Sequence, residues 1–182
     1  MHRKAEATVE DLARVPDDGK AELVNGELAI MSPAGGFHNF AAGEIYSSLR
    51  VYSRDTRSGR AITDNAGFLV DLPHRKSFSP DAAFYLGSLS RSFLKGAPVF
   101  AVEVRSEGDY GPAAEREMAE KRADYFAAGT LVVWDVDLQG EDVIRSHRAD
   151  APDRPTVYRR GEAADAEPAV PGWSMPVVEL FP

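Results

Sequence analysis

Two apolar runs joined by one helix constrain the fold of this chain most. Residues 97–109 (APVFAVEVRSEGD) and 131–137 (LVVWDVD) each contain a short apolar run, and the second is continuous, as in a strand buried on both faces. Between them residues 111–129 predict a helix, with Pro112 in its first turn and Gly129 at its C-terminal end. A strand–helix–strand crossover of this kind makes its two strands parallel neighbours in one sheet.

The rest of the chain supplies a hairpin, a second helix and further strands. Asn25-Gly26 predicts a hairpin over residues 20–31, because both central positions of a type I′ turn need positive φ, and the register pairs Leu23 with Leu28. The other predicted elements are a helix over 37–56, a strand over 60–72 bulged near 65–67, a strand over 75–86, a loop or short helix over 87–95, and a closing hairpin of 141–149 and 155–161 around an acidic, proline-bearing loop. The predicted fold class is therefore mixed α/β (α+β), with a mixed central sheet, flanking helices and an N-terminal β-hairpin.

Length and composition favour one ordinary globular domain. We expect a single domain over residues 1–182, with an N-terminal extension at 1–19 and an apolar tail at 169–182 that packs on the body or on a second subunit. The chain has no cysteine, which excludes disulfides and cysteine-ligated zinc. Its apolar runs are too short to span a membrane and its first residues lack a secretory apolar region, so a cytoplasmic location is expected.

Two of the apolar runs carry one carboxylate each, where the pattern calls for an apolar residue. Asp81 lies in SPDAAFYL and Glu103 lies in FAVEV. Burying an unpaired carboxylate costs on the order of several kcal/mol, so such a group pairs, binds a metal or becomes neutral. If the two strands are neighbours, Asp81 and Glu103 converge on one side of the sheet, where two like charges need a cation. Mg²⁺ suits this position, because it accepts one or two carboxylates and keeps waters as its other ligands.

The helix over 111–129 offers a third charged group. Its apolar residues form a stripe at helical steps, and Lys121 falls at the edge of that stripe, so its side chain points toward the sheet that carries Glu103. A lysine there can position a nucleophilic water and stabilise a charged transition state. We expect the Lys121 ammonium within about 6 Å of a carboxylate oxygen of Asp81 or Glu103. Partial desolvation can lower the pKa of a lysine, but not usefully that of an arginine.

The motifs around these residues resemble those of a known superfamily. SPDAAFY and FAVEVRS are similar to motifs II and III of the PD-(D/E)XK, or restriction-endonuclease-like, superfamily. The chain most resembles one bacterial group within it, the Uma-two family of putative restriction endonucleases. The segments AELVNGELAIMSP, His38, SPDAAFY, PVFAVEVRS, EKRADYFAAGTLVVWDVD and PGWSMPVVELF occur in the order found in that family, over about residues 20–182.

This resemblance implies a metal-dependent endonuclease, a hydrolase that cleaves DNA phosphodiester bonds by metal-activated water. Asp81 and Glu103 would be catalytic and, with the backbone carbonyl of Val104, would hold Mg²⁺ or Mn²⁺. Lys121 would replace the lysine that the superfamily usually carries two residues after the strand glutamate, where this sequence departs from the motif with Arg105. Arginine is always protonated and cannot be a general base, so Arg105 would bind phosphate or pair with Glu103.

Each candidate also has a plainer structural interpretation. Asp81 can be a turn acid, and Glu103 can form a structural salt bridge. Lys121 can be an exposed partner of Glu117 four residues earlier, with Arg122 as a rival for its catalytic role.

Glu22, His38 and Arg105 are accessory candidates. Glu22 lies on the wet face of the hairpin or, by the resemblance, acts as an outer active-site acid. His38 contacts phosphate or a metal-bound water, or is a surface histidine near the start of a helix.

Two functions remain open at this point. The first is the DNA endonuclease. The second is a catalytically silent nuclease-fold protein acting as a binding or assembly module, which Arg105 and the net charge of −8 favour, because DNA-coating proteins are usually basic. An acidic chain can still bind DNA through a local basic cleft on a dimer. A homodimer is expected from the apolar tail and from the symmetry that double-strand cleavage favours.

Overall fold

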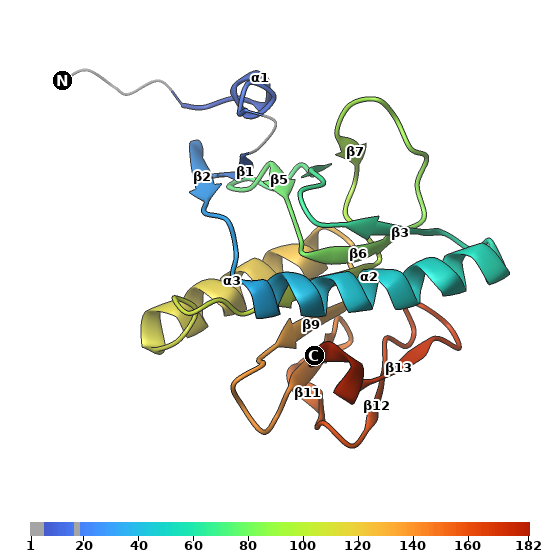
Figure 1. Cartoon of the computed structure of the whole chain (residues 1–182). Coiled ribbons are helices and arrows are strands. Elements are labelled where there is room, and N and C mark those ends of the chain that lie inside the picture. The colour runs from blue at the N-terminus through green and yellow to red at the C-terminus, as the bar shows by residue number, and fades with distance from the viewer. Residues whose placement is uncertain (1–5, 17–18) are drawn as a thin grey trace.

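The computed structural model describes residues 6–16 and 19–182, and its centre is one six-stranded sheet (Figure 1). The strand order is β11-β10-β9-β8-β6-β3. The strands are β3 (Arg60–Thr63), β6 (Ala82–Tyr85), β8 (Phe100–Val104), β9 (Val132–Val136), β10 (Ile144–Arg148) and β11 (Ala151–Tyr158). β8 and β9 pair in parallel and the other neighbours are antiparallel. The mixed sheet and the predicted crossover are therefore confirmed.

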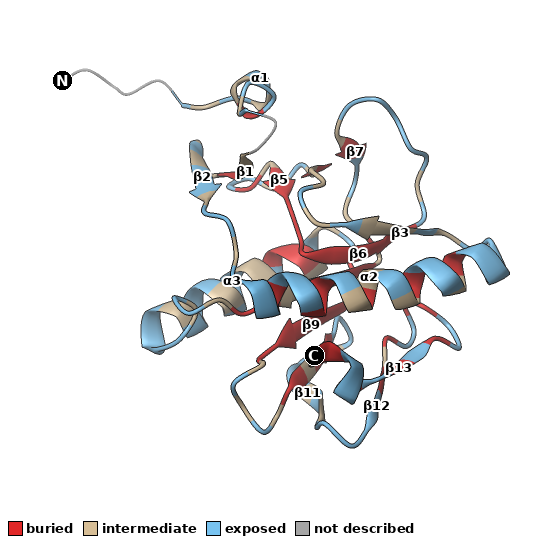
Figure 2. Ribbon diagram, viewed as in Figure 1, coloured by how far each residue is buried: buried red, intermediate tan, exposed pale blue. Residues whose placement is uncertain are grey.

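Two long helices cover opposite faces of this sheet. Helix α2 (Gly36–Thr56) packs with the side chains of Phe84, Val102 and Trp134, whereas α3 (Pro112–Ala127) buries Tyr125 against Ala101 and its neighbours on the other face. Because residues alternate across a strand, successive side chains of β8 point in turn toward the face covered by α2 and the face covered by α3. Figure 2 shows the consequence, with buried residues running through the central strands. Since both faces are covered, β9 is buried along its whole length.

The N-terminal hairpin forms as predicted. Its strands are β1 (Lys20–Val24) and β2 (Glu27–Met31), and Leu23 pairs with Leu28. The turn residues Asn25 and Gly26 have φ of 51° and 71°, as a type I′ turn requires. Before the hairpin, the short helix α1 (Val9–Leu12) is capped by Thr8. Residues 1–5 and 17–18 of the predicted N-terminal extension lie outside the described residues.

Small sheets complete the fold. They contain β4 (Phe68–Leu69), β5 (Ser77–Phe78) and β7 (Leu94–Lys95) in the order β5-β4-β7, and the pair β12 (Ala163–Asp165) with β13 (Ser174–Pro176), followed by the 3₁₀ helix η1 (Val177–Leu180). No helix in the described part of the chain is long and apolar enough to cross a membrane.

Four predictions about the bounds of strands and loops are wrong. The segment 60–72 is not one bulged strand, because the chain turns at Asn65 (φ 63°) and its halves enter different sheets. The segment 75–86 likewise divides into β5 and β6, and the predicted loop or short helix over 87–95 contains β7. Pro152, which was predicted in the acidic loop of the closing hairpin, lies within β11. β11 is an edge strand, where a missing N–H costs no pairing.

The apolar tail packs on the body of its own chain. Trp173 contacts the rings of Trp134 and Phe100, with centroid distances of 5.3 and 5.7 Å. Its indole N–H donates a hydrogen bond to the Ser48 hydroxyl of α2 at 3.1 Å. Val170, Met175, Val177 and Leu180 are buried in the same cluster. The tail therefore supplies no argument for a second subunit, and the homodimer stays a prediction.

Candidate active site

Asp81, directly before β6, and Glu103, on the neighbouring antiparallel strand β8, face one another. Ala82 pairs with Val102, and the same register continued by one residue sets Asp81 opposite Glu103. Residues in that relation have Cβ atoms about 4.5–5.5 Å apart. Two hydrogen bonds with the backbone of β8 hold Asp81 in place. Its N–H donates to the Val102 carbonyl at 2.9 Å, and its carboxylate accepts the Val104 N–H at 2.8 Å. The convergence that the sequence predicted is thus present.

Asp81 contacts Lys20, which sequence analysis did not identify, and His38, which it gave as an accessory candidate. The Lys20 ammonium donates to Asp81 and to Asp64, both at 2.7 Å, and the His38 Nε2 lies 3.2 Å from the other oxygen of Asp81. Burial alone would raise the pKa of the Asp81 carboxyl, but the hydrogen bond from His38 and the charge of Lys20 outweigh burial and hold it well below its usual range. Asp81 is therefore a carboxylate at neutral pH.

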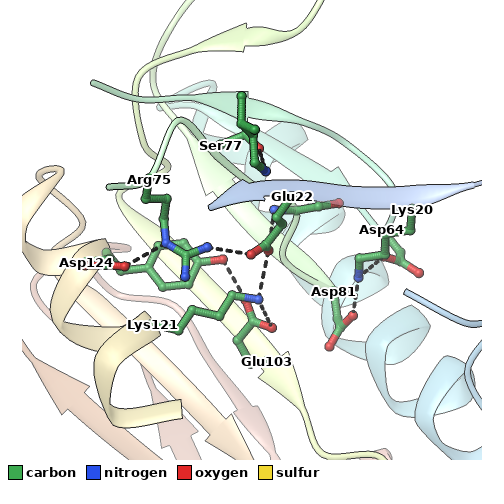
Figure 3. A network of polar contacts seen from close by, with 12 residues as sticks. Lys20, Glu22, Asp64, Arg75, Ser77, Asp81, Glu103, Lys121 and Asp124 are labelled. Carbon is green, nitrogen blue, oxygen red and sulfur yellow. Dashed lines mark hydrogen bonds and ion pairs between the residues drawn. The ribbon is translucent and has the colours of Figure 1, made fainter. Parts of the chain in front are cut away.

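Lys121 lies between two acids, as Figure 3 shows. Its ammonium is 2.9 Å from an oxygen of Glu103 and 2.9 Å from an oxygen of Glu22. The expected approach to Glu103 is confirmed, and Lys121, not Arg122, makes it. Tyr125, on the same helix, donates its hydroxyl to Glu103 at 2.6 Å. Glu103 thus has a cation and a neutral donor as partners, and its proposed salt bridge with Arg105 is wrong.

Burial and the neighbouring charges together set the charge state of Lys121 and Glu103. Burial lowers the pKa of Lys121, but the charges of Glu103 and Glu22 outweigh burial and raise it above its ordinary value. The lowering effect of desolvation on the pKa of Lys121 is therefore outweighed, and the side chain stays an ammonium. Burial and the charge of Asp81 raise the pKa of Glu103, against the lowering effect of Lys121. A group that neutralises Glu103 and Asp81 together would relieve this repulsion.

Glu22 is an interior residue, so its placement on the wet face of the hairpin is wrong. Its side chain is 6% exposed and accepts the Ser79 N–H at 2.9 Å. Arg75 joins it to α3: the guanidinium lies 2.6 Å from Glu22 and 2.7 Å from Asp124, and stacks over the Phe78 ring. We call Arg75, Glu22 and Asp124 the arginine clamp. It fixes the acid that in turn holds Lys121.

Arg105 turns away from Glu103. Its guanidinium makes two hydrogen bonds of 2.7 Å to Asp135 on β9 and two more to Glu115 on α3. The side chain is 5% exposed, and these two carboxylates hold its pKa far above the ordinary value, chiefly through the Asp135 hydrogen bonds. Arg105 therefore ties the crossover helix to the sheet, and its charge is already neutralised.

A large cavity opens over these groups. We call this space of about 1240 Å³ the main cavity, and Asp81, Glu103, Val104, Lys20, His38 and Lys121 are among its lining residues. Its position brings solvent and any ligand to the facing carboxylates.

The donors present fit a hard divalent cation. Two facing carboxylates are enough for Mg²⁺, which keeps waters as its remaining ligands. Within residues 6–16 and 19–182 no cluster of three or more histidine, aspartate or glutamate side chains could hold a metal, so the protein would supply no more than the Asp81 and Glu103 carboxylates and backbone oxygens such as that of Val104. At present an ammonium group contacts each carboxylate, Lys20 on Asp81 and Lys121 on Glu103.

Some of the missed residues left a signal in the sequence. Lys20 precedes Glu22 by two residues, which places both on one face of the hairpin strand. Because that face was assigned to solvent, Lys20 was missed together with the burial of Glu22. Asp64 and Arg75 left no such signal, because their partners are 44 and 49 or more residues away in the chain.

The fold and the site define a class of protein. A mixed sheet with a parallel crossover pair and two facing acids from neighbouring strands is the arrangement of the restriction-endonuclease-like fold, although here the lysine comes from the crossover helix. The Uma2 family, described as putative restriction endonuclease, matches residues 8–178. The chain belongs to this family.

One solved structure shares the fold over nearly its whole length. It is the crystal structure of a putative nuclease belonging to DUF820 from Anabaena variabilis ATCC 29413. The alignment has a TM-score of 0.74 and 17% sequence identity, and covers 96% of this chain and 97% of that chain. At this identity the likeness shows the fold alone. No curated protein matches the sequence.

Proposed function

We propose that this protein is a metal-dependent endonuclease that hydrolyses phosphodiester bonds of DNA. The observation that carries the proposal is the facing pair Asp81 and Glu103 on the wall of the main cavity, with the Lys121 ammonium 2.9 Å from Glu103. Membership of a family described as putative restriction endonuclease supports the same reaction.

The residues divide the work by their chemistry. Asp81, Glu103 and the Val104 carbonyl would hold Mg²⁺ or Mn²⁺, which when bound supplies positive charge to the scissile phosphate and acidifies water. Lys121 stays protonated, so it acts as a hydrogen-bond donor that orients the attacking water and stabilises negative charge, not as a base. Tyr125 and Glu22 hold Glu103 and Lys121 in place. His38 is an accessory candidate through its contact with Asp81.

The wider setting remains an expectation. DNA would enter the main cavity, a homodimer would present one site to each strand of a duplex, and a cytoplasmic location would give access to the substrate. We do not propose Arg105 as a phosphate ligand, because Asp135 and Glu115 already neutralise its charge.

Plasmid nicking tests the proposal directly. The protein is incubated at low salt with supercoiled plasmid and Mg²⁺ or Mn²⁺, beside Asp81→Asn and Glu103→Gln, which keep side-chain size. We expect nicked product from the natural sequence and none from either variant. Equal background nicking in all three samples would reject the endonuclease.

One observation favours the alternative of a catalytically silent binding or assembly module. Each candidate ligand already has a lysine partner, so the acids could serve as structural ion pairs. Calorimetric titration with Mn²⁺ separates the two functions. The endonuclease requires binding at or below millimolar concentration, lost in Asp81→Asn, whereas the silent module predicts no binding heat.

A further inference from the structure

A second cavity joins the main cavity beside the N-terminus of α2. This space of about 970 Å³, the side cavity, is lined by residues from five segments, including Phe37, Tyr110, Arg160 and Phe181. Pro33, Ala34, His38, Arg105, Ser106 and Gly108 line both cavities. The two cavities are therefore immediate neighbours, within reach of one extended ligand.

Exposed aromatic rings border the side cavity. Phe37 is 69% exposed and Tyr110 is 37% exposed, which is unusual for such large side chains. Tyr110 is held in place, because its hydroxyl donates to Asp137 at 2.8 Å. Phe181 has the guanidinium of Arg160 stacked on its ring at 3.6 Å. Rings and guanidinium planes are the surfaces on which unstacked nucleobases bind.

The N-terminus of α2 supplies anion-binding chemistry at the junction of the cavities. Its N-cap, Gly35, offers no capping side chain, and the first turn of this fully described helix contains no acid. Space is open at the Cβ positions of Gly35 and Gly36. The first N–H groups of a helix have no intrahelical acceptor and attract phosphate.

A buried histidine at the same junction is incompletely satisfied. His38, in the first turn of α2, is 9% exposed and lines both cavities, and in the described part of the chain its Nδ1 is the one buried side-chain polar atom without a hydrogen-bond partner. Buried polar atoms are nearly always paired, so the Nδ1 of His38 leaves a position for a hydrogen-bond partner, a water or a ligand, at this junction.

We propose that the side cavity binds an unpaired nucleotide of the DNA substrate, with its phosphate at the N-terminus of α2 and its base on Phe37 and Tyr110. This rests on the proposed function, since it assigns a substrate class to the same site. Bases in an intact duplex are stacked on their neighbours and present no free face. The preferred substrate is therefore single-stranded DNA, or duplex with a gap, bulge or frayed end.

Binding without chemistry tests the side cavity by itself. The full chain is titrated, in a chelator and without divalent ions, into a fluorescein-labelled single strand of about 12 nucleotides, within the ~4–16 typical of single-strand sites, and into the matching blunt duplex. We expect the single strand to bind at least about 5-fold more tightly. Phe37→Ala should weaken single-strand binding about 5- to 150-fold, the loss expected when one base–aromatic stack is removed.

Two further variants sharpen the result. Val51→Ala removes another exposed apolar side chain from α2, 59% exposed and about 21 Å further along the helix, and should change nothing. Glu107, an acid on the wall of the side cavity, repels phosphate, so Glu107→Gln should tighten single-strand binding.

The outcomes separate this inference from the endonuclease. If the plasmid is nicked but single strand and duplex bind equally and Phe37→Ala matches Val51→Ala, the side cavity is not a nucleotide site and the endonuclease stands. If the plasmid is not nicked but single-strand binding depends on Phe37, the endonuclease fails and the nucleotide site stands. A dimer in light scattering that Phe37→Ala dissociates, with DNA affinity unchanged, would assign the patch to self-association and overturn the inference.

Discussion

Lys121 is fixed by two carboxylates, and this contact decides both its charge and its use. With Glu22 and Glu103 each 2.9 Å away, the ammonium cannot give up its proton near neutral pH, so any catalytic effect is electrostatic. The plainer structural interpretation, an exposed ion pair between Lys121 and Glu117, is wrong. The Lys121 side chain is 20% exposed and faces the sheet.

Replacing Lys121 with methionine keeps the length of the side chain and removes the charge. We expect Lys121→Met to lower turnover about 10²–10³-fold, the cost of losing one aimed donor to a developing charge. Mn²⁺ binding should survive, because Asp81 and Glu103 remain. Turnover is measured by nicking rate and binding by calorimetry.

Arg116→Met is the matched control for Lys121. It removes an exposed cation from the same helix, α3, outside the main cavity, and should leave turnover unchanged. Equal losses in the two variants would mean that general electrostatics of α3, and not the position of Lys121, governs the rate.

At the scale of elements, the arginine clamp joins the N-terminal hairpin to α3. Arg75→Met should lower the free energy of unfolding by about 3–5 kcal/mol, because Glu22 and Asp124 would keep their buried charges without this partner. Urea denaturation measures the change.

The neighbouring residue provides the control for the clamp. Lys76 also pairs with an acid, Asp71 at 2.6 Å, but the two side chains are 41% and 95% exposed. Lys76→Met should therefore cost no more than about 1 kcal/mol. If both variants cost the same, the clamp contributes no more than a surface pair.

Some of the helices and strands could be predicted from the sequence and others could not. The hairpin register and the parallel crossover follow from local signals: the positive φ of Asn25-Gly26 and the spacing of two apolar runs around one helix. The strand over 60–72 was misjudged because residues 60–69 are locally compatible with one strand, and only pairing with β6 on one side and β5 on the other divides them.

The candidate site shows the same division. Asp81 and Glu103 were visible as acids within apolar runs, and Lys121 as the edge of a helical stripe. Lys20, Asp64 and Arg75 were not, because a surface-type residue in the sequence becomes a buried partner only through long-range contacts. The partners of Arg105, Asp135 and Glu115, were missed for the same reason, so the sequence analysis paired Arg105 with phosphate or with Glu103.

At the scale of the whole molecule, the tail closes the core over one face of the sheet. Trp173→Ala should lower the free energy of unfolding by about 3–5 kcal/mol, since it empties a site that is 4% exposed. The mass in light scattering should equal that of the natural sequence, because the ring contacts are within the chain. A variant that changed the mass would place the tail in a subunit interface.

Val178→Ala is the control within the same tail. Val178 lies in η1 and is 56% exposed, so its truncation should change the free energy of unfolding by no more than about 0.5 kcal/mol.

The contact between Trp134 and Trp173 is an intrinsic spectroscopic probe of how the tail packs. These are the two tryptophans of the chain; one belongs to the central strand β9 and the other to the tail, with ring centroids 5.3 Å apart. Two indoles this close couple their electronic transitions, so the near-ultraviolet circular dichroism carries a signal of the pair that neither ring gives alone. Detachment of the tail would remove that signal and shift the tryptophan emission to longer wavelength while the far-ultraviolet spectrum still reported an intact sheet. The closing of the core can thus be followed in the unlabelled protein, in real time, by light alone.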